Sequence, residues 1–216
     1  MRRRNDPARQ SLRPNQDRVR SLARCPLAHR RSLTSVTGRI VLSLSFAVIM
    51  SVAARVQIAL PFTPVPITFQ TFVALLAGML LGPGLGMAAM LEYLCLGAIG
   101  FPVFAHGGGI AYFLSPTAGY LISFPLAAAL TGKVVQTLGR EDVRSFGLAA
   151  MVGLIVNYSI GCLWLSAITR QDAWMALIWG VLPFIGLDIV KGAIAACLAA
   201  AASRMAHNQW HDRPGS

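Results

Sequence analysis

The chain has 216 residues, of which 55% are hydrophobic and 12% are charged, and its formal net charge is +11. An ordinary soluble domain carries about 25% charged residues, so this composition excludes that class and indicates an integral membrane protein. Eleven of the nineteen basic residues are arginines within the first 39 positions, accompanied there by Asp6 and Asp17. The sequence therefore predicts a nearly neutral hydrophobic body behind a basic arm.

Residues 1–39 are polar, irregular and rich in arginine, which predicts a disordered cytoplasmic arm. Basic residues gather on the cytoplasmic flank of a first membrane helix and favour anionic lipid head groups. We expect those roles for the arm rather than binding to nucleic acid. A targeting signal is the other alternative, because Arg30 and Arg31 precede a hydrophobic run. No convincing cleavage site follows Leu60, so we interpret that run as a retained helix.

Hydrophobic segments after the arm predict an all-α integral membrane protein with six transmembrane helices. The first segment has twenty-one residues, enough at about 1.5 Å per residue to cross a hydrocarbon core of about 30 Å. The predicted spans are residues 40–60, 67–81, 85–100, 118–138, 145–169 and 183–203. We interpret residues 40–203 as one substrate-binding membrane domain and residues 204–216 as a short cytoplasmic tail.

The connections between these spans have distinctive compositions. Three prolines in residues 61–66 prevent a helix there, so this stretch is either a rigid external loop or a re-entrant segment lining a cavity. Residues 82–84, Gly-Pro-Gly, predict a tight turn. Residues 101–117 are rich in glycine and proline and predict a flexible lid, and the tryptophans in residues 170–182 predict an interfacial helix.

The distribution of arginine predicts the orientation in the membrane. With the N-terminus inside, the inner segments hold the arginine arm, Arg140, Arg144 and Arg204, whereas the outer loops hold only Arg170. Positively charged loops favour the cytoplasmic side. The sequence therefore predicts that both termini are cytoplasmic.

Two charged residues, Asp188 and Lys191, interrupt the last hydrophobic span. A charge at membrane depth costs at least a few kcal/mol on insertion scales, so it usually faces a partner or a cavity. A spacing of three places both side chains on one helical face. They are either a structural ion pair or part of a ligand site, and we favour the ligand site. Arg55, near the outer end of the first span, is expected at about the same depth in the membrane as Asp188 and Lys191.

Other polar residues recur in the remaining spans, namely Gln70, Glu92 and Asn157. They could converge beneath the outer loops and bind a compact solute with both donor and acceptor groups. A cation channel would instead need rings of carboxylates or carbonyls. The alternatives are that Gln70 caps its helix, that Glu92 pairs with Arg55, and that Asn157 bridges two helices.

The sequence carries little that indicates an enzyme. The string His106-Gly107-Gly108-Gly109 could form an oxyanion hole only beside a nucleophile elbow, and no G-x-S-x-G string occurs. The four cysteines are widely separated and form no C-x-x-C pair, so they predict neither a metal site nor a disulfide framework. We therefore expect no catalysis, metal or cofactor, and a membrane-embedded enzyme remains only a rival hypothesis.

Four strings, in order and sensibly spaced between Val41 and Ala200, resemble one known family. They are PVPITFQTFVALLAGMLLGPGLG, LGAIGFPVFAHGGG, SPTAGYLISF and LPFIGLDIVKGAIAA. Together they resemble the BioY family, the biotin-specific substrate-binding (S) components of energy-coupling factor (ECF) transporters. The chain departs from the family pattern in one string, where Ser115-Pro116-Thr117-Ala118-Gly119-Tyr120 replaces the usual Gly-Pro-Thr-Gly-Gly-Tyr.

The resemblance implies a six-helix protein of the prokaryotic inner membrane that binds biotin from outside. It also implies association with a coupling transmembrane subunit and a pair of ATPases. The family's Asp and Lys of the sixth helix fall on Asp188 and Lys191, Gln70 lies in the second-helix motif, and Tyr93 and Tyr158 fall where the family commonly has Tyr. With Asn157 and Arg55, these are the expected ligand residues. Another small vitamin-like solute is the alternative ligand.

Overall fold

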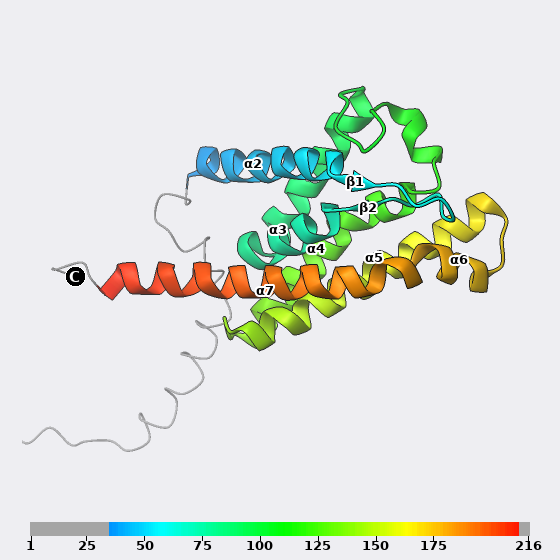
Figure 1. Ribbon diagram of the computed structural model, residues 1–216. Coiled ribbons are helices and arrows are strands. Elements are labelled where there is room, and N and C mark those ends of the chain that lie inside the picture. The colour runs from blue at the N-terminus through cyan, green and yellow to red at the C-terminus, as the bar shows by residue number, and fades with distance from the viewer. Residues whose placement is uncertain (1–34, 212–216) are drawn as a thin grey trace, which may run out of the picture.

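The computed structural model describes residues 35–211 of the chain. Residues 1–34 of the predicted arginine arm and residues 212–216 of the predicted tail lie outside this range. The elements, shown in Figure 1, are α2 (Val36–Arg55), β1 (Gln57–Ile58), β2 (Ile67–Thr68), α3 (Gln70–Ile99), η3 (Ile110–Leu114), α4 (Ala118–Leu138), α5 (Val143–Thr169), α6 (Ala173–Gly180) and α7 (Leu182–His211). The predicted all-α membrane class is confirmed, because α2, α3, α4, α5 and α7 are long and apolar enough to cross a membrane.

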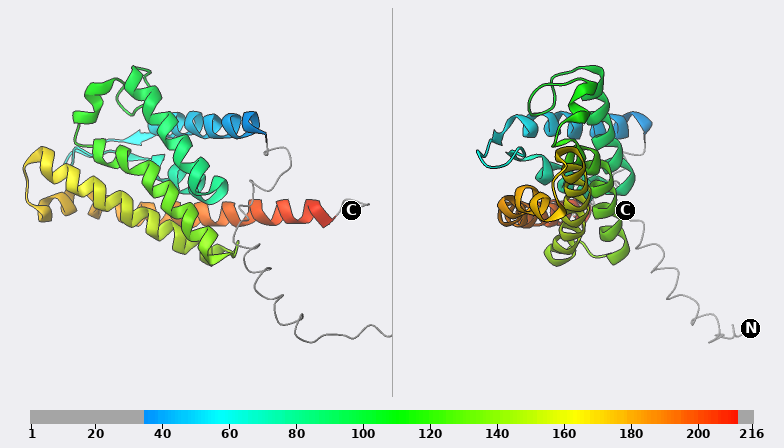
Figure 2. Two further views of the ribbon diagram at one scale, coloured as in Figure 1. Left: turned by 180° about the vertical axis from the view of Figure 1, so that it is seen from behind. Right: turned by 90° about the vertical axis from the view of Figure 1, so that its right-hand side faces the viewer.

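The long helices form an elongated bundle with two distinct ends. Figure 1 and the left view of Figure 2 show the start of α2, the α4–α5 connection and the end of α7 at one end, which we call the terminal end. The β1–β2 pair and α6 lie at the opposite end, called the hairpin end. The N-terminus of α2 and the C-terminus of α7 therefore lie at the same end of the bundle.

The helix α3 doubles back on itself at the predicted turn. Gly82 has φ 80° and ψ 179°, outside the helical region, and Pro83 follows it. The amide Nε2 of Gln70 lies 2.8 Å from the hydroxyl of Tyr93, although a straight helix would separate these residues by about 34 Å. The turn predicted at residues 82–84 is confirmed, and α3 consists of two limbs that pack side by side.

Close contact between backbones holds this turn against α4. A Cβ atom added to Gly132 would lie 2.5 Å from the nitrogen of Pro83 and 2.6 Å from the carbonyl carbon of Gly82. A Cβ added to Gly78 would lie 2.3 Å from the carbonyl oxygen of Ala128. Small residues let membrane helices approach closely and gain van der Waals contact, so these glycines position α3 relative to α4.

Some predicted boundaries were wrong. The first span was predicted to continue to Leu60, but α2 ends at Arg55 because residues 57–58 pair antiparallel with residues 67–68 instead of extending the helix. The resulting hairpin encloses the three prolines. The last span was predicted to end near Ser203, but α7 continues to His211. No glycine or proline occurs between Ala193 and Arg213 to break that helix.

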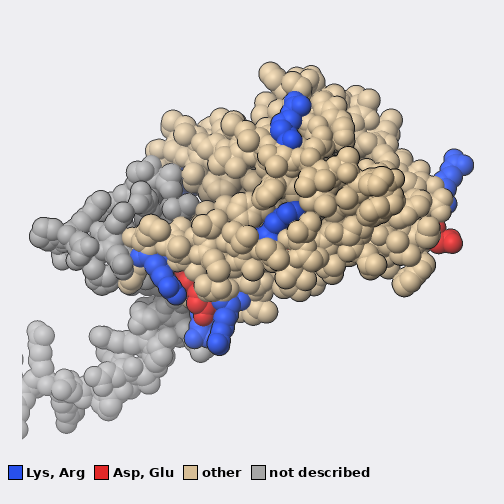
Figure 3. All heavy atoms as spheres, viewed as in Figure 1, with Lys and Arg blue, Asp and Glu red and all other residues tan. Residues whose placement is uncertain are grey.

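The outer surface of the bundle suits a lipid environment. Large apolar side chains are exposed along α2, α3, α5 and α7. Figure 3 shows that uncharged residues cover most of one face and that charged side chains gather mainly near its two ends. Packing inside the bundle centres on fully buried residues between α2, α3 and α4, among them Met50, Met90, Tyr93 and Phe104.

The contact between α3 and α4 generates a stability prediction. We expect Gly132→Ala to lower the free energy of unfolding by about 1–3 kcal/mol, because the new methyl group meets backbone atoms that cannot move independently. Gly147→Ala is the matched control, since no atom lies within 4 Å of a Cβ there. Thermal unfolding in detergent measures both variants. Equal midpoints would show that the α3–α4 contact tolerates the extra methyl group.

Candidate functional site

A cavity lies among α3, α4, α5 and α7, toward the hairpin end of the bundle. The space between its walls, with the open mouth included, is about 530 Å³. Apolar, aromatic and polar residues share its wall. The lining residues are Val65, Pro66, Thr68, Gln70, Thr71, Ala105, Tyr112, Thr117, Tyr120, Leu121, Phe124, Asn157, Tyr158, Gly180, Phe184, Asp188 and Lys191.

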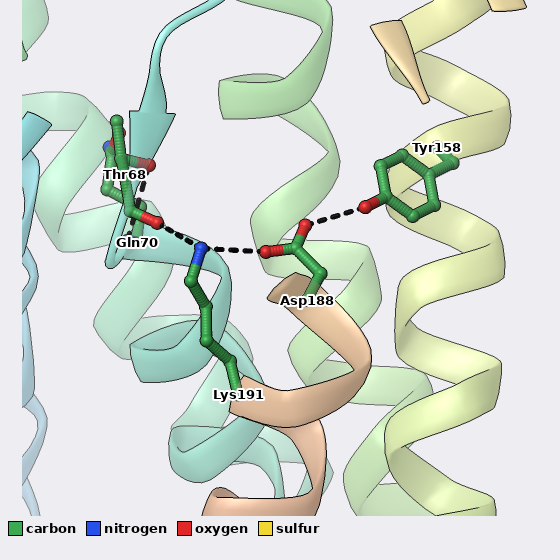
Figure 4. A network of polar contacts seen from close by, with 5 residues as sticks. All are labelled: Thr68, Gln70, Tyr158, Asp188 and Lys191. Atoms are coloured by element: carbon green, nitrogen blue, oxygen red, sulfur yellow. Dashed lines mark hydrogen bonds and ion pairs between the residues drawn. The ribbon is translucent and has the colours of Figure 1, made fainter. Parts of the chain in front are cut away.

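The charged pair predicted on the last span forms one side of this cavity. The Nζ atom of Lys191 donates to Asp188 Oδ1 at 2.8 Å, and the two residues are only 8% and 4% exposed. The hydroxyl of Tyr158 donates to Asp188 Oδ2 at 2.7 Å. Figure 4 shows Tyr158 of α5 reaching across to the carboxylate on α7. Both carboxylate oxygens therefore have a hydrogen-bond donor, as a buried charge requires.

Lys191 also holds the β hairpin against α7. Its Nζ atom donates to the backbone carbonyl of Thr68 at 2.7 Å and lies 5.6 Å from the ring centroid of Phe69. Figure 4 shows the ammonium group between the Thr68 carbonyl and the Asp188 carboxylate. One buried cation thus connects β2, the start of α3 and α7, and it still has a third N–H donor.

Gln70 is 2% exposed and lines the cavity from the first turn of α3. Its Nε2 atom donates to the hydroxyl of Tyr93 at 2.8 Å. Tyr93 is completely buried, on the second limb of α3, and does not belong to the cavity wall. The prediction that Tyr93 directly contacts ligand is therefore not supported by its position, because Gln70 lies between it and the cavity.

Asn157 is 3% exposed and lines the cavity from α5. Its Oδ1 atom accepts a hydrogen bond from the hydroxyl of Ser123 on α4 at 2.6 Å. The residue consequently combines the two alternatives offered by the sequence: it bridges two helices and also presents a polar group at the cavity wall.

Neither Arg55, which was predicted to contact ligand, nor Glu92 lines the cavity, and the two residues do not form the ion pair that was one alternative for Glu92. The guanidinium group of Arg55 is exposed and donates to the carbonyl of Pro102. Glu92 instead accepts from the hydroxyl of Ser43 at 2.8 Å. Ser43 lies twelve residues before Arg55 on α2, about 18 Å along the helix axis, so the two charges lie at different levels.

Aromatic residues complete the cavity, and several were not predicted. Tyr120 and Phe124 stand one turn apart on α4, and Tyr112 comes from η3. The hydroxyl of Tyr120 donates to the carbonyl of Gly180 at 2.9 Å, which joins α4 to α6. The spacing of Tyr120 and Phe124 directly after a Gly/Pro-rich loop was the available signal.

Two further aromatic residues, Phe184 and Trp164, have different positions relative to the cavity. Phe184 lines the cavity, whereas Trp164 does not, because its indole nitrogen donates to the carbonyl of Ser115 at 3.0 Å. The complete wall thus places hydrogen-bonding groups of both kinds beside aromatic rings. This arrangement can hold a compact molecule that has polar edges and apolar faces.

The ion pair leads to a prediction about ligand-free protein. We expect Lys191→Met to lower the free energy of unfolding by about 3–5 kcal/mol, because it leaves the buried carboxylate of Asp188 without its counter-charge. The double variant Asp188→Asn/Lys191→Met should lose less than Lys191→Met alone, since no unpaired charge remains. Thermal unfolding without ligand provides the measurement. If the loss in the double variant equalled the sum of the losses in Asp188→Asn and Lys191→Met, the two residues would not be energetically coupled.

Comparison with known proteins shows related sequences and a related structure. The BioY family model matches residues 24–208. The "Probable biotin transporter BioY" of Pyrococcus horikoshii is 46% identical over 155 residues, covering 71% of this chain and 89% of that protein. The "Biotin transporter BioY" of Rhizobium etli is 37% identical over 175 residues, covering 77% of this chain and 93% of that protein.

The fold is similar to a crystal structure described as the S-component for biotin from an ECF-type ABC transporter. The TM-score is 0.72 at 26% sequence identity, over 78% of this chain and 92% of the other. The relatives named above are transporters rather than enzymes. The family model and these matches extend over most of the described helices, and the chain belongs to the BioY family.

Proposed function

We propose that this chain binds biotin and acts as the substrate-specificity component of an ATP-driven vitamin uptake system. The observation that carries the proposal is the buried Asp188–Lys191 pair at the wall of a cavity with polar and aromatic residues. The names of its relatives, which describe biotin transporters, support the choice of ligand. The family consists of transport proteins, so we assign no catalytic step to the chain.

The chemistry of the cavity wall suits the ureido ring of biotin. Each carboxylate oxygen can accept more than one hydrogen bond, so Asp188 can take ureido N–H donors while it remains bound to Lys191 and Tyr158. The third N–H of Lys191 can donate to the ureido carbonyl or to the ligand carboxylate. Gln70 and Asn157 add amide groups, and Tyr120, Phe124 and Phe184 can cover the apolar faces of the ligand.

We also propose that the chain crosses the prokaryotic inner membrane six times, with both termini in the cytoplasm. Each limb of α3 would provide one crossing, which is supported by the doubling back at Gly82. Arg140 and Arg144 flank the start of α5 at the terminal end, and positive charge favours the cytoplasmic side. On this orientation the cavity, at the hairpin end, faces the outside.

Transport would require other subunits. The sequence contains no G-x-x-x-x-G-K-[ST] string, so the ATPases and a coupling transmembrane subunit are proposed as partners. The ECF context of the similar structure supports this assignment. The proposed contact between anionic lipids and the arginine arm concerns residues that lie almost entirely outside the described range.

Biotin binding tests the site directly. We expect Asp188→Asn and Lys191→Ala each to weaken biotin binding by about ten- to a hundredfold, because a hydrogen bond to a charged group is worth about 1.5–3 kcal/mol. Isothermal titration calorimetry of purified protein in detergent measures the change. Wild-type affinity in both variants would reject this assignment, and competition by other unlabelled vitamins would identify a different ligand.

Matched controls separate loss of the site from a general effect of removing charge. Lys133→Ala and Asp172→Asn change the same residue types at exposed positions away from the cavity wall. Both controls should bind biotin with wild-type affinity. A comparable loss in either control would indicate that the cavity residues were not responsible.

The proposed orientation predicts the location of the chain terminus and of the outer loops. A reporter that is active only in the cytoplasm should function when fused after Ser216. The same reporter inserted after Gln171, in the α5–α6 connection, should be inactive. Activity at Gln171 together with inactivity at the C-terminus would reverse the proposed topology.

A further inference from the structure

We propose that Arg55, Phe101, Ile110 and Leu114 form a docking site for a phospholipid of the outer leaflet, hereafter the lipid patch. Its apolar residues would contact the acyl boundary and Arg55 would bind the phosphate group. This inference depends on the chain being embedded in a membrane, but not on the identity of the solute in the cavity.

The lipid patch lies beside the last turn of α2. The guanidinium group of Arg55 donates to the carbonyl of Pro102, and Gln57 Nε2 donates to the carbonyl of Ala105 at 3.1 Å. These contacts place the beginning of the α3–α4 connection level with the end of α2. In Figures 1 and 2 this connection extends to the side of the bundle, whereas α6 occupies the hairpin end.

The apolar residues of the patch are exposed although they belong to a connection between two helices. Phe101 is 56%, Ile110 78% and Leu114 71% exposed, and they continue from Ile99, which is 76% exposed at the end of α3. Large exposed apolar side chains that are concentrated in one connection indicate an interaction site. Because this surface extends directly from a membrane helix, lipid is the occupant that it fits.

The α3–α4 connection, which carries these exposed residues, is attached to the bundle core. Phe104 is completely buried, and its ring centroid lies 5.4 Å from that of Tyr93. The amide of Gly109 donates to the carbonyl of Gly97 at 2.7 Å. The backbone of the loop is thus held inward while the side chains of the patch point away from it.

The distribution of charged residues in the sequence agrees with a lipid contact at the α3–α4 connection. No Asp, Glu, Lys or Arg occurs between Glu92 and Lys133, although this interval includes the whole α3–α4 connection. A loop surrounded by water would normally carry such residues. Uncharged loops with aromatic residues suit the membrane interface.

Arg55 provides the complementary charge for a phosphate. No acidic side chain within residues 35–207 forms an ion pair with it, and its guanidinium group donates to the carbonyl of Pro102. A guanidinium group has five N–H donors, so donors remain for a second acceptor. Arginine binds phosphate through paired charge-assisted hydrogen bonds. Arg55, which does not line the cavity, would therefore bind the phosphate group of the lipid.

Lipid-dependent fluorescence quenching tests the apolar part of the patch. An environment-sensitive fluorophore is attached to Leu114→Cys, with the native cysteines replaced by alanine, in vesicles of phosphatidylethanolamine and phosphatidylglycerol. A shallow spin-labelled phospholipid should quench this fluorophore at least twofold more than one at His106→Cys, an exposed polar position in the same loop. Unchanged biotin binding would verify that both labelled proteins are folded.

Other outcomes of this experiment overturn the proposal. Equal lipid quenching at the two positions would show that lipid does not contact the patch selectively. Stronger quenching of the Leu114→Cys label by aqueous iodide would place the patch in water. A signal that changes with protein density in the vesicles but not with spin-labelled lipid would indicate contact with a second copy instead.

Phospholipid retention tests the role of Arg55. Arg55→Gln keeps a side-chain N–H donor but removes the positive charge, so it should retain less phospholipid through purification than wild-type protein. Arg170→Gln is the control, because Arg170 is an exposed arginine in a different connection. A phosphate assay of the purified proteins gives the result. Equal retention in all three proteins would overturn the assignment of Arg55.

Discussion

The buried ammonium group of Lys191 is the interaction on which the candidate site depends. It lies between the carboxylate of Asp188 and the backbone carbonyl of Thr68, with donor–acceptor distances of 2.8 and 2.7 Å. Neither the cation nor the carboxylate would be stable alone at this depth. Their mutual pairing therefore keeps α7 and the β hairpin together and, at the same time, leaves charged groups beside a cavity.

The rest of the bundle supports this arrangement in layers. Tyr158 fixes the second oxygen of Asp188, and Tyr93 supports Gln70 from the protein interior. Farther from the cavity, the turn of α3 packs against Gly132 of α4. Each layer limits the movement of the one nearer the cavity, so residues that never touch a ligand contribute to the geometry of the wall. Such support is typical of precise binding sites.

The β hairpin and the α3–α4 connection have different environments and therefore different roles. The hairpin is bound to α7 through Lys191 and to α6 through the hydroxyl of Thr63, which donates to the carbonyl of Trp179 at 2.8 Å. The α3–α4 connection supplies Ala105 and Tyr112 to the cavity and turns Ile110 and Leu114 outward. The proposed lipid contact would consequently act on the same connection that closes one side of the cavity.

The sequence by itself determined the membrane class, the turn at residues 82–84 and the placement of Asp188 and Lys191 on one face of the last long helix. Long apolar segments, a Gly-Pro-Gly string and charges inside an apolar run are local patterns with direct physical costs. Only the tertiary structure decided which polar groups meet: it separated Arg55 from Glu92, placed Tyr93 behind Gln70, and brought Tyr112, Tyr120 and Phe124 to the cavity. These outcomes depend on where α2 ends and how α3 doubles back. A sequence pattern specifies how deep a residue lies along its helix, but it does not specify which neighbouring helix the residue faces.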